Sequence, residues 1–406
     1  MNVRLEIGAM EARTPAPPHG TLGEMANRLR GNPEQDRMLR HILELDGFRG
    51  IAALAVFCNH LFTAPAHPAW FTSSAIWLYR VSRFGQYGVD LFFVLSGYLI
   101  TSILLKDRNS PDYYYNFYWK RALRILPLYL VSLLAAWLWF GESTGGVILS
   151  VFFLANFSRV FHLTLSGPYW TLAIEEQFYL IWPQFLRRLR VGQVEKCAWA
   201  IVIAEPILRL IDAAFHHSNF FFTFFHCDGL AFGALLACQL SPRQDGALAT
   251  RNIMPKQPAI RILGFSCVLL LATGKFIYSP RYAPQAIALF LSAINLFFYS
   301  SIRIAVENSG ARFLAIFRSR TMVFFGLISY CLYISQTYVL RTYDELRHPV
   351  LAENYVGYWV RIAIVFCATI AVCVISRYAL ELPFMSLRKY VLRQRPILGV
   401  VQGAES

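Results

Sequence analysis

The chain has 406 residues, of which 56% are hydrophobic and only 15% are charged. These values exclude a disordered chain, which needs low hydrophobicity, and an ordinary soluble enzyme, whose cores could not hide so much apolar surface. The 38 Lys and Arg residues outnumber the 24 Asp and Glu residues and give a formal net charge of +14. Because a nucleic-acid-binding protein rarely carries so much Phe, Leu and Ile, we predict no nucleic-acid partner and assign the basic excess to cytoplasmic loops of a membrane protein.

The first part of the chain is polar and rich in Pro and Arg, so we predict a partly disordered cytoplasmic tail over 1–42. A bilayer span needs roughly 20 mostly apolar residues. Ten runs of about this length follow and predict transmembrane helices over 47–66, 86–105, 122–140, 169–186, 197–215, 220–240, 260–277, 283–302, 321–341 and 357–380.

The loops predict the orientation, because a basic cluster precedes the first run and follows every second one. With both termini cytoplasmic, all of these clusters lie on the cytoplasmic side, as the positive-inside rule requires. The short apolar run 147–157 would reverse the later loops if it crossed, so we predict that it lies in the outer interface or re-enters. The predicted fold class is therefore all-α, with a polytopic membrane domain over 43–390, about ten transmembrane helices and a cytoplasmic C-terminal tail over 391–406.

The first predicted span carries two ionisable residues, which are costly in hydrocarbon and mark functional positions. Arg49 and His60 are 11 residues apart, which on a helix is about 16 Å of rise and a net rotation of about 20°. The two side chains therefore share one face, with Arg49 near the cytoplasmic boundary and His60 near the bilayer centre. A neutral imidazole in this place can act as a general base. The alternative is a core His that is bonded to a neighbouring helix.

The second and third spans add polar positions that a structural role also explains. Asp90 lies near the outer end of its span, where a packing seam with an interfacial acid explains it as well as a direct role does. Arg121 and Arg124 are three residues apart and face the same way. With Lys120 they form a cationic cluster at a cytoplasmic entrance, and guanidinium groups suit phosphate. Taken alone, this cluster is more typical of a positive-inside anchor.

In the fourth span two adjacent glutamates, Glu175 and Glu176, enter from the outer side. Adjacent residues do not share a helix face, so at most one of them points at a given site. Solvation at the membrane interface accounts for one of the two carboxylates but not for both.

Together these segments resemble the integral-membrane acyltransferase family 3. The chain meets the family's Arg-x10-His pattern at Arg49 and His60 and its Arg-x-x-Arg pattern at Arg121 and Arg124, with Pro127 and Tyr129 behind. The Gly-Val-Asp-Leu-Phe-Phe-Val-Leu-Ser-Gly pattern is met by 88–97. The Trp-Ser-Leu-x-x-Glu-x-x-Phe-Tyr pattern is met by 170–179, with Thr171 in place of Ser. Weaker matches at 329–334 and 381–383 complete six motifs in the family's order over roughly 43–390.

One position departs from the family's pattern. The family often has a His shortly after its Ser-Tyr-x-x-Tyr-Leu stretch, and this chain has Gln336 there. A Gln side chain forms hydrogen bonds but does not take up a proton at neutral pH. An acid–base role at this position is therefore in doubt, whereas His60 is unaffected.

The resemblance implies an O-acyltransferase of the inner cell membrane that moves an acyl group, commonly acetyl from acetyl-CoA, to a hydroxyl of an exopolysaccharide, lipopolysaccharide or oligosaccharide. It implies that His60 is the base and that Glu175 orients the acceptor or the imidazole. The expected donor-binding residues are Arg49, Lys120, Arg121, Arg124 and Tyr129, and the expected acceptor-binding residues are Asp90, Trp170, Tyr179 and Tyr330. Acyl-CoA is then a co-substrate, and we expect no bound cofactor and no metal.

Three alternatives remain open at the level of the sequence. A transporter or flippase would use the same intramembrane polar residues to line a path. An acyltransferase could instead act on a lipid, a peptide or a secondary metabolite. A catalytically silent scaffold is disfavoured because the His, Arg and Glu positions are intact. No activated Ser or Cys nucleophile is evident, so direct transfer is preferred to an acyl-histidine intermediate.

Overall fold

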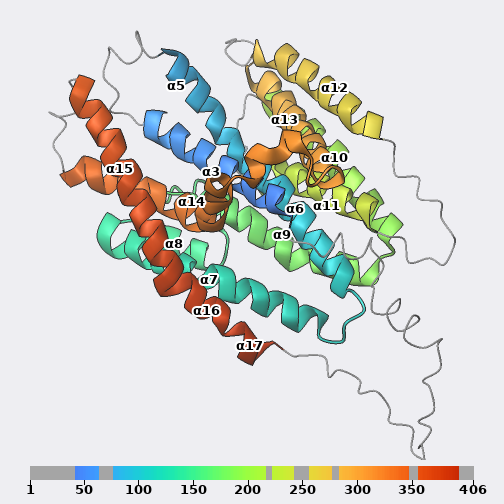
Figure 1. Cartoon of the computed structure of the whole chain (residues 1–406), viewed down its shortest axis with the longest axis horizontal. Helices are drawn as coiled ribbons and strands as arrows, with labels where there is room; N and C mark the ends of the chain where they lie inside the picture. Colours follow the sequence, from blue (N-terminus) through green and yellow to red (C-terminus); the bar gives the residue numbers. More distant parts are fainter. Residues whose placement is uncertain are drawn as a thin grey trace, which may run out of the picture. The chain divides into compact units, whose positions relative to one another are not determined.

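The computed structural model describes six stretches of the chain (Figure 1), which are residues 42–63, 76–215, 222–241, 256–276, 283–346 and 355–392. Within these stretches the secondary structure is helical and includes no β-strand, so the all-α prediction is confirmed there. The tails predicted over 1–42 and 391–406 lie almost entirely outside the described residues.

A helix coincides with each of the ten predicted spans. These helices are α3 (Leu43–Thr63), α6 (Gly88–Asp107), α7 (Tyr113–Phe140), α9 (Tyr169–Arg188), α10 (Val191–Ala214), α11 (Cys227–Leu240), α12 (Lys256–Gly274), α13 (Ala283–Glu307), α14 (Arg320–Leu346) and α15 (Tyr355–Ser376). Shorter elements connect them: α5 (Ile76–Arg83), η1 (Phe84–Tyr87), α8 (Thr144–Val151), η2 (Ala155–Phe157), η3 (Thr223–Phe225), η4 (Arg312–Arg318), the π-helix η6 (Arg377–Glu381), α16 (Leu382–Ser386) and α17 (Arg388–Val391).

Among the described residues, five helical stretches are long and apolar enough to cross a membrane. They are Trp77–Asp107, Tyr113–Phe140, Ala283–Glu307, Arg320–Leu346 and Val356–Val391. The apolar helix α11 is shorter, and α8 has eight residues, or about 12 Å of rise, which is too little to cross a bilayer. The chain is therefore a membrane-helical protein, while the count of ten crossings and the orientation of the termini stay predictions.

The helices α6 and α11 pack closely because each presents glycine to the other's backbone. A Cβ on Gly97 would lie 2.0 Å from the carbonyl oxygen of Leu230, and one on Gly233 would lie 2.1 Å from that of Val94. Small residues at such crossings are typical of membrane helices, whose association depends on close van der Waals packing. This packing fixes α6 relative to α11.

The helices α3 and α14 form another extensive contact of the same kind. A Cβ on Gly50 would lie 2.2 Å from the carbonyl oxygen of Met322, and one on Gly326 would lie 2.1 Å from that of Asp46. The backbones of α3 and α14 therefore touch near the first turns of both helices.

We expect Gly233→Ala to destabilise the protein, because the added methyl group would overlap backbone atoms of α6 that cannot move away cheaply. Forcing a methyl group into a packed contact costs about 1–3 kcal/mol. Gly264→Ala on α12 is the matched control, since a Cβ there meets no atom within 4 Å and Ala favours a helix. Thermal unfolding of the two purified variants measures the difference, and equal midpoints would contradict the close contact.

Candidate functional site

Four arginines from three helices lie close enough for their charges to act on one another. Arg124 on α7 is subject to the charges of Arg49 on α3, Arg121 on α7 and Arg388 on α17. The ion pairs among the described residues join other cations to carboxylates, and none of them includes one of these four arginines. Because like charges repel in such a group, the cluster favours an anionic ligand that carries several charges.

The carboxylate of Glu175 on α9 connects this arginine cluster to α6. Its Oε1 accepts a hydrogen bond of 3.0 Å from the Ser96 hydroxyl, and its Oε2 accepts one of 3.2 Å from the Tyr179 hydroxyl. The Arg121 guanidinium lies 4.9 Å from the centroid of the Tyr179 ring. The charges of Arg49 and Arg121 both act on Glu175. Glu175 and Tyr179 are one turn apart, so both face the arginines from the same side of α9.

His60 lies in the last turn of α3. Gln336 on α14 is the side chain that interacts with its imidazole. Gln336 is 1% exposed, and its Nε2 donates to the carbonyl oxygen of Tyr333 at 3.3 Å. His60 Nδ1 and Gln336 Oε1 are buried and have no hydrogen-bond partner among the described residues. The position at which the chain departs from the family's pattern is therefore beside His60.

Three of the residues expected at the donor or acceptor site are engaged elsewhere in the packing. Lys120 forms a half-exposed ion pair with Asp107, at 3.6 Å. The Tyr129 side chain is fully buried, and its hydroxyl donates to the carbonyl oxygen of Ser150 at 2.7 Å. The Tyr330 hydroxyl donates to a backbone carbonyl of α7 at 2.9 Å and ties α14 to α7.

Asp90 and Trp170 lie near a different group of polar side chains. Asp90, in the first turn of α6, is 4% exposed and is subject to the charges of Asp228 and Arg209. The Trp170 ring, at the start of α9, lies 5.5 Å from the ring of His226. These two residues therefore interact with polar side chains other than the four arginines.

The sequence interpretation missed a fully buried ionic network on α10, α11 and α13. The side chains of Arg209 and Asp228 are 0% exposed and form an ion pair. Arg209 also donates to the Ser292 hydroxyl at 2.8 Å, Asn295 donates to Asp228 at 3.0 Å, and Glu205 accepts from the Asp228 backbone N–H at 2.8 Å. The sequence carried a signal for this network, because Glu205, Arg209 and Asp228 are ionisable residues inside predicted spans.

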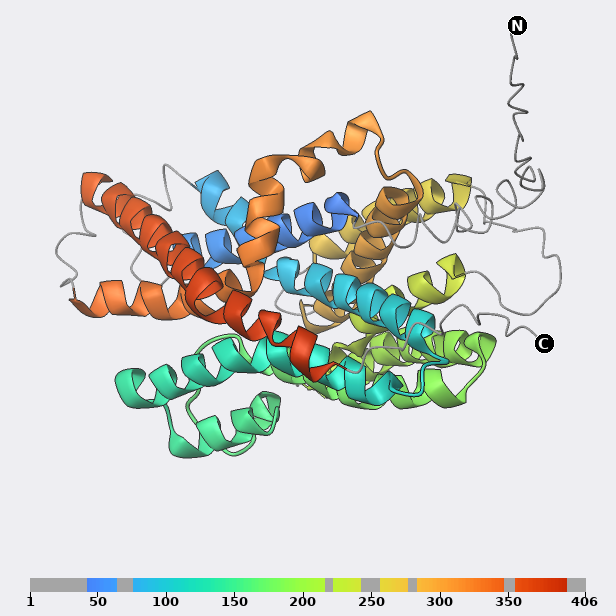
Figure 2. The same cartoon turned by 60° about the horizontal axis from the view of Figure 1, so that its bottom comes forward.

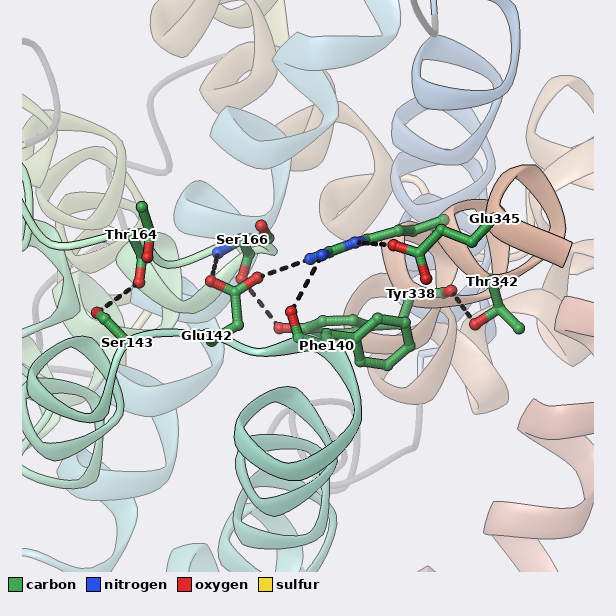
Figure 3. A network of polar contacts seen from close by, with 9 residues as sticks. Phe140, Glu142, Ser143, Thr164, Ser166, Tyr338, Thr342 and Glu345 are labelled. Carbon is green, nitrogen blue, oxygen red and sulfur yellow. Dashed lines mark hydrogen bonds and ion pairs between the residues drawn. The ribbon is translucent and has the colours of Figure 1, made fainter. Parts of the chain in front are cut away.

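A third network joins the end of α7 and the segment before α9 to α14 (Figure 3). Glu142 is 5% exposed and accepts hydrogen bonds from Arg341 at 3.1 Å and from the Ser166 backbone N–H at 3.0 Å. Tyr338 donates to the Ser166 carbonyl oxygen at 3.0 Å, and Arg341 also donates to the Phe140 carbonyl oxygen at 3.0 Å. These bonds fix the entry of the chain into α9.

Thr171, which stands where the family's pattern has Ser, forms a hydrogen bond through its hydroxyl. Thr171 on α9 pairs its hydroxyl with the Tyr333 hydroxyl on α14 at 2.7 Å, in a buried contact. Tyr333 also carries the carbonyl that accepts from Gln336, so α9 and the surroundings of His60 are connected through this residue.

A comparison with models of protein families matches residues 42–378 to the acyltransferase 3 family, described as an acyltransferase domain. All of the proposed site residues on α3, α6, α7, α9 and α14 lie within the matched range, whereas Arg388 lies beyond it.

Curated relatives are similar over part of their length. The chain is 34% identical over 167 residues to the peptidoglycan O-acetyltransferase OatA of Listeria monocytogenes, covering 36% of this chain and 24% of that protein. It is 27% identical over 350 residues to a putative O-acetyltransferase of Staphylococcus aureus, covering 76% of this chain and 52% of the relative. The aligned part thus spans between a quarter and a half of these relatives. No solved structure matches.

Proposed function

The chain belongs to the acyltransferase 3 family, and from this premise we propose that it is a membrane-embedded O-acyltransferase that moves an acetyl group from acetyl-CoA to a hydroxyl of a carbohydrate. The observation that carries the proposal is the arginine cluster, whose member Arg49 lies on the face of α3 that leads to His60. A cluster without carboxylate ion pairs suits the phosphates of CoA, and an imidazole farther along the same face suits proton abstraction from a hydroxyl. The peptidoglycan O-acetyltransferases among the relatives support a glycan acceptor.

In this proposal Arg49, Arg121 and Arg124 bind the phosphates of the donor. Guanidinium groups form paired hydrogen bonds with phosphate and stay charged at every relevant pH. Glu175 and Tyr179 are positioning residues, because the Tyr179 ring faces the Arg121 guanidinium and the Glu175 carboxylate holds the Tyr179 hydroxyl. The pantetheine arm then follows α3 for about 16 Å, the rise from Arg49 to His60.

The two other residues expected to bind the donor have indirect roles in this proposal. Lys120 contributes a long-range charge at the entrance, because its ammonium group is half exposed and paired with Asp107. Tyr129 supports α7 through its packing, because its hydroxyl already bonds to Ser150.

His60 supplies the proton chemistry. It accepts the proton of the acceptor hydroxyl as that oxygen attacks the thioester carbonyl carbon. The resulting intermediate collapses with cleavage of the C–S bond, and the imidazolium returns the proton to the sulfur. The products are the acetyl ester and CoA, with no net change in protons. Gln336 interacts with the imidazole and orients it, because a neutral amide can hold one tautomer without competing for the proton.

The acceptor binds beside α6 and α9 in this proposal. Trp170 offers a ring face for a sugar, Asp90 offers a buried carboxyl group, and Tyr330 supports the wall through its bond to α7. Together with ten spans and cytoplasmic termini in the inner membrane, this arrangement lets donor and acceptor approach His60 from opposite sides of the bilayer.

The donor site is tested by acetyl-CoA binding to the purified protein. We expect Arg124→Ala to weaken the binding of acetyl-CoA about tenfold or more, because a hydrogen bond to a charged group is worth about 1.5–3 kcal/mol. Isothermal titration calorimetry measures this dissociation constant without knowledge of the acceptor. Arg188→Ala, at the C-terminal end of α9, is a control for the general loss of one positive charge.

The acceptor is tested by mass spectrometry of surface glycans and lipids from a deletion strain and from the strain complemented with the gene. Loss of acetyl groups from a glycan, restored by the wild type, is the expected result. Unchanged acetylation of every glycan and lipid would overturn the proposal and favour a transporter. Loss confined to a lipid would overturn the carbohydrate acceptor.

A further inference from the structure

We propose that Arg388 on the C-terminal α17 is a fourth phosphate-binding residue of the donor site, so that a segment beyond the family match completes the binding of the CoA nucleotide. This inference rests on the proposed function. It concerns a residue of the basic cluster that follows the tenth predicted span.

The C-terminal helices lie against the helix that carries the Arg121 and Arg124 pair. Both α16 and α17 contact α7, and Figures 1 and 2 show them beside it. Arg388 Nη2 donates to the carbonyl oxygen of Lys120 at 3.4 Å. In an α-helix the carbonyl of residue 120 points along the axis toward the amide of residue 124. The Arg388 guanidinium therefore lies at the turn of α7 that carries Arg121 and Arg124.

The chain reaches this place along one continuous helical stretch, Val356–Val391, which includes a π-helical segment. The π-helix η6 (Arg377–Glu381) is held by an ion pair of 3.1 Å between its first and last residues. Pro383 lies in the first turn of α16, which begins at Leu382. A π-helical segment of this kind is rare and is frequently found at functional sites. The helices that follow it, α16 and α17, contact α7, and Arg388 thereby reaches the cluster.

The positive charges around Arg388 favour the binding of an anion there. The charge of Arg388 acts on both Arg121 and Arg124, and its Nε is buried without a hydrogen-bond partner among the described residues. A fourth cation beside three others raises the repulsion within the cluster unless a ligand of high negative charge is bound. CoA carries a diphosphate bridge and a ribose 3′-phosphate, so it offers more phosphate groups than one pair of arginines can bind.

The neighbouring residue provides a matched control. The Lys389 ammonium lies 4.8 Å from the centroid of the Tyr390 ring, and Tyr390 is 76% exposed. Lys389 therefore points to another side of α17 and carries the same charge as Arg388. Replacing either residue removes one positive charge from the same helix, but only one of the two changes belongs to the cluster.

The experiment compares Arg388→Ala, Arg388→Lys and Lys389→Ala with the wild type in binding titrations of the purified full chain. The probes are acetyl-CoA and S-acetylpantetheine, which has the same thioester arm without phosphates. We expect Arg388→Ala to weaken acetyl-CoA binding about tenfold, Arg388→Lys to weaken it less, and Lys389→Ala to change it less than about twofold. Binding of S-acetylpantetheine should be the same in all four proteins.

Each outcome decides the inference. Equal acetyl-CoA affinities of Arg388→Ala and Lys389→Ala overturn it, while the donor site at Arg124 stands. An equal loss of affinity for the phosphate-free probe also overturns it, because Arg388 would then act through the structure of α17. If the wild type binds no acetyl-CoA, the proposed function itself fails and the inference falls with it.

Discussion

His60→Ala is expected to lower the rate of acyl transfer by about 100- to 10,000-fold, the range that a positioned general base contributes. The affinity for acetyl-CoA should stay within about twofold of the wild type, because His60 lies about 16 Å of helix rise from Arg49. The rate is measured as acetyl ester formed on the glycan identified in the deletion strain. Affinity is measured by titration, so that the chemical step and donor binding are separated.

A residue two positions away serves as the control for the His60 variant. Cys58 lies on the same helix and is partly exposed, and on a helix it points away from the face of His60. Cys58→Ala should therefore keep most of the activity. Wild-type acetylation by His60→Ala would show that the imidazole takes no part in the reaction. A common loss in both variants would point to disturbed packing of α3.

The second large effect concerns stability. Asp228→Ala should destabilise the protein by about 3–5 kcal/mol, because it leaves the buried Arg209 guanidinium without its carboxylate partner. Arg209 is 0% exposed and cannot reach water without breaking the contacts of α10 with α11 and α13. We expect little folded protein in detergent extracts and a strongly lowered unfolding temperature, measured by fluorescence-detected size exclusion after heating.

An exposed ion pair provides the contrast. Lys120 and Asp107 are 39% and 37% exposed, and exposed pairs contribute about 0–1 kcal/mol. Asp107→Ala should therefore unfold close to the wild-type temperature. If Asp228→Ala were as stable as Asp107→Ala, the buried network would not hold α10 and α11 together. Its ionisable residues would then need another explanation.

The helices could be predicted because each follows from the apolar residues of its own segment. The residues at which the helices begin and end could not be predicted in this way. The helix α7 starts at Tyr113, nine residues before the predicted span, because its aromatic first turns pack against α9. The Tyr113 hydroxyl donates to the carbonyl oxygen of Pro183 at 3.2 Å, and the Arg187 guanidinium lies 5.4 Å from the centroid of the Tyr113 ring. An aromatic, partly polar segment carries no hydropathy signal for such a contact.

The site was predictable where one helix determines it. Arg49 and His60 share a face of α3, and Arg121 and Arg124 share a face of α7, because helical periodicity alone fixes these relations. The family resemblance drawn from these spacings is confirmed by the match over residues 42–378. The expected contribution of Lys120 depended on its nearness in sequence to Arg121, and that of Tyr129 on the family's motif. Side-chain contacts with other elements engage both residues.

By itself the sequence determined that the chain is an all-helical membrane protein. Its motifs, and not its net charge or hydropathy, identified the acyltransferase 3 family. The tertiary structure decided which helices meet. It brought Gln336 beside His60, Ser96 to Glu175, and Arg388 to the arginines of α7. The physical reason is that helical spacing acts over a few turns of one segment. Contacts between helices depend instead on where glycines let two backbones approach and where buried charges find partners.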